Sequence, residues 1–165
     1  MRTRPVGTKG VGTTLRAVRR VLRIILFLGF LITGTDLLLL GHYEDAKQVI
    51  PLVLIAVGLV VLSWHAFYGG AASVRALQVT MVLFIASGML GAVLHYRSNM
   101  EFQLEMDSSL SGLKLFSKVM QAKAPPALAP SAMAQLGLLG LAYAYRHPAL
   151  AGSPDESNHD HGSLT

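Results

Sequence analysis

The chain has 165 residues, of which 52% are hydrophobic and only 14% charged, and it contains no cysteine. A soluble domain carries about 25% charged residues, so this composition excludes an ordinary soluble fold. The lack of cysteine excludes a disulfide-stabilised domain and thiol chemistry. The net charge of +5 does not indicate nucleic-acid binding, because half of the Lys and Arg residues lie before or at the start of the first apolar segment.

Apolar residues gather in four segments, 21–41, 49–68, 74–95 and 127–145. The charged residues within these segments are Arg23, Asp36 and Arg75. About 20 helical residues cross a hydrocarbon core of about 30 Å. The sequence therefore predicts an all-α polytopic membrane protein, with four transmembrane helices in an up-down bundle.

The distribution of charge predicts three regions and an orientation. Residues 1–20 form a basic arm, residues 21–148 the membrane domain, and residues 149–165 a polar tail that we expect to be disordered. Seven Lys and Arg residues lie at the N-terminal side: Arg2, Arg4, Lys9, Arg16, Arg19, Arg20 and Arg23. The positive-inside rule then places both termini in the cytoplasm, with the arm against an anionic inner leaflet.

Small residues recur along the apolar segments at helical spacing. Ser87 and Gly91 are four residues apart, as are Gly88 and Ala92, and Gly137 lies one turn before Gly140. Such pairs allow two helices to approach closely in lipid. The same motif serves internal packing and homodimer formation, and we expect internal packing.

The connection between the third and fourth segments carries its own pattern. Residues 100–107 alternate apolar and polar side chains, which is typical of a strand, but they also fit an outward extension of the preceding helix. After them, Ser109 is placed to cap a short amphipathic helix with Phe116 and Val119 on its apolar side. We expect this helix to lie on the outer membrane surface, because it is too short to span.

Asp36 is the main intramembrane polar candidate. An ionised carboxylate costs about 2.5–3.5 kcal/mol at the centre of a membrane helix and less towards its edge. Asp36 is therefore either a proton or cation ligand, or a residue near the outer end that reaches the headgroups or pairs with a neighbour.

Imidazole and carboxylate groups on the outer side suggest a metal site, but no two of them have a recognised ligand spacing. The metal candidates are His42, His95, Glu101 and Glu105. His65 and His147 lie at the inner ends of the second and fourth segments, where interface residues are expected. No nucleophile elbow, phosphate-binding loop or zinc-protease motif is present, so the sequence predicts neither an enzyme nor a cofactor.

The stretch from His95 to Phe102, together with Leu128–Pro130 and Leu136–Tyr143, resembles small uncharacterised bacterial inner-membrane proteins with four spans. The resemblance covers about the last half of the chain. It implies a bacterial origin and a multi-pass location in the plasma membrane, and it transfers no catalytic residue.

Two functions remain open from the sequence. The first is a non-enzymatic accessory or scaffold subunit of a membrane complex, with another membrane protein or a second copy as partner. It is favoured because intramembrane polar residues are few, whereas transport paths need several. The alternative is sensing or transport of divalent cations or protons through Asp36 and the outer His and Glu residues.

Overall fold

The computed structural model describes residues 8–122 and 128–151. These residues are helical and contain no strand. The elements in chain order are α1 (Thr8–Leu39), α2 (Ala46–Tyr68), α3 (Ala71–Met106), α4 (Gly112–Met120), α5 (Leu128–Ala144) and a 3₁₀ turn η1 (Pro148–Leu150). The predicted all-α class is confirmed for this part of the chain.

Three of the described helices, α1, α2 and α3, are long and apolar enough to cross a membrane. Even the shortest of them, α2, has 23 residues, or about 35 Å at 1.5 Å per residue. Most of their side chains are exposed in the isolated chain, including large apolar residues on every turn of α1. Helices that are apolar on nearly all sides require lipid or other protein around them. The protein is therefore a membrane protein.

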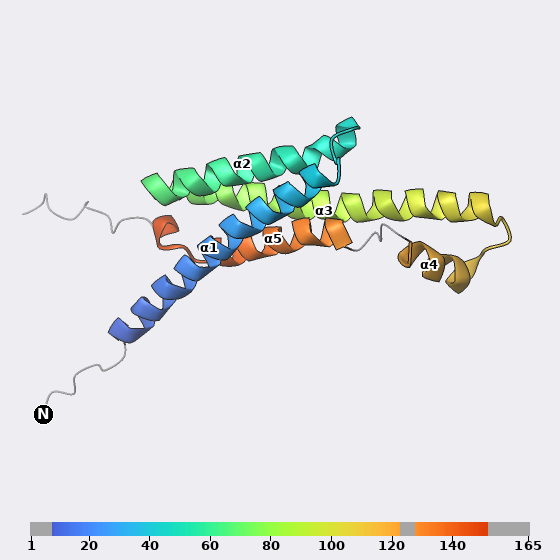
Figure 1. The fold of residues 1–165 in the computed structure, drawn as a ribbon. Coiled ribbons are helices and arrows are strands. Elements are labelled where there is room, and N and C mark those ends of the chain that lie inside the picture. Colours follow the sequence, from blue (N-terminus) through green and yellow to red (C-terminus); the bar gives the residue numbers. More distant parts are fainter. Residues whose placement is uncertain (1–7, 123–127, 152–165) are drawn as a thin grey trace, which may run out of the picture.

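The helix α3 is the centre of the arrangement, because α2, α4 and α5 all pack against it. In Figure 1, α1 crosses α2 and α5 obliquely, and its N-terminal part projects away from the other helices. The long helices α1, α2, α3 and α5 alternate in direction along the chain, and α3 continues beyond the ends of α2 and α5, where α4 lies alongside it. One end of the bundle thus collects the end of α2, the start of α3 and the end of α5.

Large side chains from three helices fill the middle of the bundle. Phe30 of α1 and Phe84 of α3 are fully buried, with ring centroids 5.1 Å apart. The Cα of Gly58 on α2 faces both rings, since a Cβ there would lie 3.1 Å from Phe30 and 3.2 Å from Phe84. Met81 and Leu26 are also fully buried. Burial of such side chains joins α1, α2 and α3 into one core.

Glycines allow α3 and α5 to approach backbone to backbone. A Cβ on Gly88 would lie 2.6 Å from the Pro130 carbonyl oxygen, and a Cβ on Gly137 would lie 2.6 Å from the Met81 carbonyl oxygen. No side chain fits into either space. The prediction that the small residues of these segments serve internal packing agrees with these contacts.

The turn from α2 to α3 is built by two glycines. Gly69 adopts a left-handed conformation (φ 51°), which ends α2, and its N–H donates to the His65 carbonyl. Gly70 then begins α3 in an extended conformation. The turn is short, so the last turn of α2 lies directly beside the first turn of α3.

Several boundaries differ from the prediction. Helix α1 begins at Thr8, so most of the predicted arm continues the first helix, and residues 1–7 lie outside the described residues. Helix α3 extends to Met106, which shows that residues 100–106 are helix rather than strand. Of the tail, residues up to 151 are described, and η1 folds onto α3.

The cap predicted at Ser109 is wrong, although a nine-residue helix lies in this connection. The Ser109 hydroxyl and N–H both donate to Asp107 Oδ1, at 2.6 and 3.0 Å, and so complete a turn after α3. These two bonds lower the pKa of the Asp107 carboxyl. Helix α4 begins later, at Gly112, and packs on α3 through Phe116 and Tyr96. Its place on the outer membrane surface stays a prediction.

Candidate functional site

Three aromatic rings from distant parts of the chain meet at the end of the bundle where α2 and α5 end. The centroid of His65 lies 4.9 Å from that of His147 and 5.7 Å from that of Tyr143. Tyr143 and His147 are themselves 5.7 Å apart. Together with Ser73 of α3, these residues form what we call the histidine cluster.

Ser73 holds His65 in place inside the protein. Only 1% of Ser73 and 5% of His65 is exposed. The Ser73 hydroxyl donates to the Gly70 carbonyl at 2.8 Å, and its oxygen lies 2.8 Å from His65 Nδ1. The Ser73 oxygen also accepts from the Gly70 N–H at 3.2 Å. Ser73 thus joins the end of α2 to the start of α3.

Two arginines of α1 border the histidine cluster. Arg19 Nη2 donates to the carbonyls of Arg146 and Tyr145, at 2.9 and 3.4 Å. Arg23 lies close enough to interact with Tyr143 and His65. Arg146 has a left-handed conformation (φ 45°), which turns the chain after α5 and presents its carbonyl to Arg19. The arginines thus join the first helix to the last.

His147 is an uncharged member of the cluster. Its Nδ1 accepts a hydrogen bond from the Ala149 N–H at 3.3 Å, which an imidazolium could not do. Burial, and then the neighbouring His65 and Arg19, lower the pKa of His147. The ring therefore stays neutral near pH 7 and supports η1 as an acceptor.

The histidine cluster has the chemistry of a structural junction. A nucleophilic serine needs its proton on a base and an open side facing the substrate. Ser73 has no open side, because its side chain is buried. The histidine cluster and the two arginines connect α1, α2, α3 and α5 at one end of the bundle.

At the opposite end of α1 and α2, the structure brings two of the predicted metal candidates together. The rings of His42 and His95 are stacked, with centroids 6.2 Å apart and planes 14° from parallel. Burial, and then His95, lower the pKa of His42, which lies in the connection before α2. Stacking of two aromatic rings explains this geometry.

The other two metal candidates do not join this pair. Glu101 and Glu105 are exposed on the part of α3 that continues past the bundle. Glu101 follows His95 by six residues, which is about 9 Å along the helix. Within the described residues, no three His, Asp or Glu side chains lie together as a metal site would require.

Asp36 lies in the last turn of α1, three residues before Leu39. Its side chain is exposed on the surface of the bundle. This position lies about 5 Å from the end of the helix. Both interpretations of Asp36, as a proton or cation ligand and as a residue that reaches the headgroups, stay predictions.

Sequence reasoning missed the histidine cluster. It treated His65 and His147 as separate interface residues, because 81 positions separate them. A signal was available in the topology: helices that alternate in direction bring the ends of the second and fourth segments together. Both ends carry a histidine within or just after the last turn.

Comparison with protein-family models, with curated proteins and with solved structures finds no match to this chain. The resemblance to bacterial inner-membrane proteins, and the origin that it implies, therefore stay predictions. The function has to be inferred from the geometry alone.

Proposed function

We propose that the protein is a non-enzymatic accessory or scaffold subunit of a membrane complex, crossing a bacterial plasma membrane four times with both termini in the cytoplasm. The observation that carries this proposal is a stripe of exposed apolar residues on α1. Four of them recur every seven residues, and each is between 47% and 62% exposed: Val11, Val18, Ile25 and Ile32.

A seven-residue repeat of β-branched side chains suits packing against another helix. In the bundle, α1 buries a different face, which includes Leu26 and Phe30. The stripe extends from the projecting N-terminal part of α1 into its membrane-spanning part (Figure 1). It thus offers a continuous surface about 32 Å long to a partner helix.

The antiparallel packing of α5 along α3 supports four spans. Helix α5 has 17 described residues, about 26 Å, and its Gly137 lies against the backbone of α3. Arg19 of α1 reaches the carbonyl of Arg146 after α5, so the beginning of the first span and the end of α5 share one side. The basic residues of α1 favour the cytoplasm for that side.

Cation sensing or transport has less support. Asp36 lies at one end of α1, and Glu101 and Glu105 lie outside the bundle. The contact between His42 and His95 is accounted for by ring stacking and does not require a metal ion. A transport path needs polar groups at mid-depth, whereas the polar clusters described above lie at the two ends.

The test is purification of the tagged full chain from its native membrane in mild detergent. We expect a second membrane protein in stoichiometric amount. Because Trp on the stripe blocks close helix packing, V18W combined with I25W should reduce partner recovery at least tenfold, about 1.4 kcal/mol of binding.

The matched control is V60W on α2, which is 68% exposed and outside the stripe. It should retain the partner, because a lipid-facing Trp is tolerated. Recovery of the chain alone, or equal recovery of the partner by the double variant, would contradict the proposal.

A further inference from the structure

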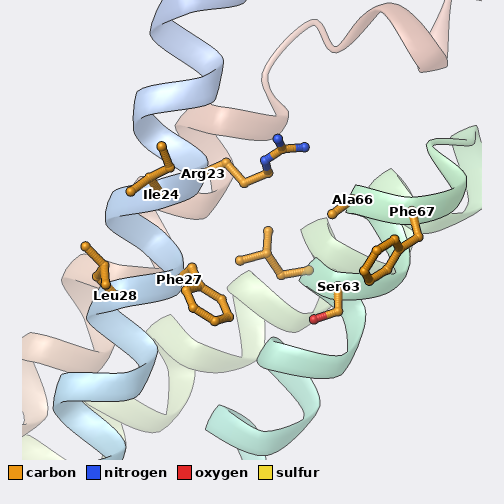
Figure 2. A pocket seen from close by; sticks show the side chains of 8 residues that line it. Arg23, Ile24, Phe27, Leu28, Ser63, Ala66 and Phe67 are labelled. Carbon is orange, nitrogen blue, oxygen red and sulfur yellow. The ribbon is translucent and has the colours of Figure 1, made fainter.

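A groove opens between α1 and α2 beside the histidine cluster (Figure 2). Its volume is about 320 Å³, within the range of ligand sites. Apolar side chains line it: Ile24, Phe27 and Leu28 from α1, with Leu62, Ala66 and Phe67 from α2. We call it the α1–α2 groove.

Arg23 is the one charged residue that lines the α1–α2 groove. Figure 2 shows its side chain extending from α1 towards Ala66 and Phe67 of α2. Helix α2 ends at Tyr68, so the guanidinium lies level with the last turn of a membrane-spanning helix. This is the depth at which lipid headgroups meet the hydrocarbon core.

The Arg23 guanidinium is held in position and still has donors to offer. It interacts with the Tyr143 hydroxyl and lies near His65. A guanidinium carries five N–H donors in a planar fork, more than one hydroxyl oxygen accepts. Such a fork matches a phosphate group, to which it binds in bidentate fashion.

Below Arg23 the α1–α2 groove continues towards the membrane centre. The distance from Arg23 to Leu28 is five helical residues, about 8 Å. Leu62 is 2% exposed and forms the floor, whereas Phe67 is 83% exposed and stands at the rim. An apolar channel with a cation at its headgroup end is complementary to an anionic amphiphile.

We propose that the α1–α2 groove binds one anionic phospholipid, with its phosphate on Arg23 and the upper part of an acyl chain between Phe27 and Phe67. Charge selects this lipid over a zwitterionic one, because a second positive group near the phosphate would face Arg23 and Arg19. Basic pockets between spanning helices are typical sites for anionic headgroups.

The experiment is native mass spectrometry of the full chain in mild detergent, with phosphatidylglycerol titrated against phosphatidylcholine of the same acyl chains. We expect one phosphatidylglycerol to remain bound and phosphatidylcholine to dissociate. R23Q should lower the affinity for phosphatidylglycerol about tenfold, because it removes a charge-assisted bidentate contact.

Two further variants separate the α1–α2 groove from general surface charge. R20Q removes an exposed arginine from the same helix and should change binding less than about threefold, as expected for a screened surface charge. A66F fills the groove from an exposed position and should prevent binding while it leaves Arg23 in place. The apolar part is tested by glycerophosphoglycerol, which lacks acyl chains and should not compete.

Equal retention of both lipids would overturn the proposal, as would unchanged binding in A66F. Competition by the chain-free headgroup would overturn it as well, because it would reduce the site to a phosphate contact. If a protein partner occupied the groove instead, A66F would release that partner and leave the lipid bound. This outcome is distinct from failure of the proposed function, which depends on the stripe of α1.

Discussion

Imidazole rings hold the last described segment of the chain against the bundle. His147 accepts from the Ala149 N–H, and His65 lies 4.9 Å away, centroid to centroid. Arg19 and Arg23 already bring positive charge to this end. A proton on His147 would break its acceptor bond and add a third cation there. The junction is therefore stable only where the ring is uncharged.

We predict that acid weakens this junction. Burial lowers the pKa of His147 from its ordinary value of about 6.5, so below that pH the unfolded chain binds a proton that the native chain does not. Native stability should thus be complete above about pH 6.5 and decline as the pH falls towards the lowered pKa. Thermal unfolding of the purified protein at about pH 7.5 and about pH 5.5 measures this decline.

H147Q is the informative variant for this prediction, because the amide oxygen can accept the Ala149 N–H and does not titrate. Its Tm should fall less than that of the wild type between the two pH values. The fall in Tm that remains in H147Q includes the contribution of His42, whose pKa is also lowered by burial. An equal or larger fall in H147Q would show that His147 is not the titrating group.

The sequence did not predict the histidine cluster as a unit. Tyr143 lies within the fourth apolar segment, and its side chain is 3% exposed and packs on His65. Ser73 gave no signal, because its role depends on the glycine turn that brings α3 beside α2. Pairings of this kind arise from the direction of helices and not from spacing along the chain.

At the scale of elements, the contact between α3 and α5 depends on the absence of side chains at two positions. We predict that G88A and G137A each lower the free energy of unfolding by roughly 1–3 kcal/mol, the usual cost of overpacking. The added methyl would meet backbone atoms 2.6 Å away, so the helices have to separate. Thermal unfolding in detergent measures the loss, at about 2–4 °C per kcal/mol.

G12A is the matched control, since Gly12 lies within α1 and has no atom within 4 Å of an added Cβ. It should be neutral or stabilising by up to about 1 kcal/mol, because Ala favours helix. If G88A and G137A behaved like G12A, the close approach of α3 and α5 would be incorrect.

The length of the apolar segments was enough to predict that they form helices, but the residues at which the helices begin and end were harder to predict. The segments 49–68 and 74–95 each lie within an observed helix, α2 and α3, because about 20 apolar residues leave little choice of structure. The extension of α3 to Met106 was left open because an amphipathic pattern of period 2 competes there with helix. The start of α4 was missed since Asp107 binds Ser109 locally.

For the molecule as a whole, the proposed four-span arrangement makes a prediction about accessibility. The chain has no cysteine, so single substitutions label cleanly. In intact cells, a membrane-impermeant maleimide should label E44C, in the connection between α1 and α2. R16C and A151C should react only after the membrane is opened, because the proposed topology places both positions on the cytoplasmic side.

A151C decides the role of α5 in this experiment. If it reacted in intact cells together with E44C, α5 would not cross the membrane, and the packing of α5 along α3 would need another explanation. Reaction of R16C and A151C with intact cells, without reaction of E44C, would instead invert the whole molecule. Exposed positions 16, 44 and 151 make all three cysteines accessible to the reagent.

The bond between Arg19 and the Arg146 carbonyl joins positions 127 apart. During synthesis, α1 leaves the ribosome long before α5 has been translated, since chains emerge from the N-terminus. This end of the bundle therefore stays open until position 146 has been synthesised. Before that point, Arg19 lacks its contact with the Arg146 carbonyl, and His65 lacks its contact with His147.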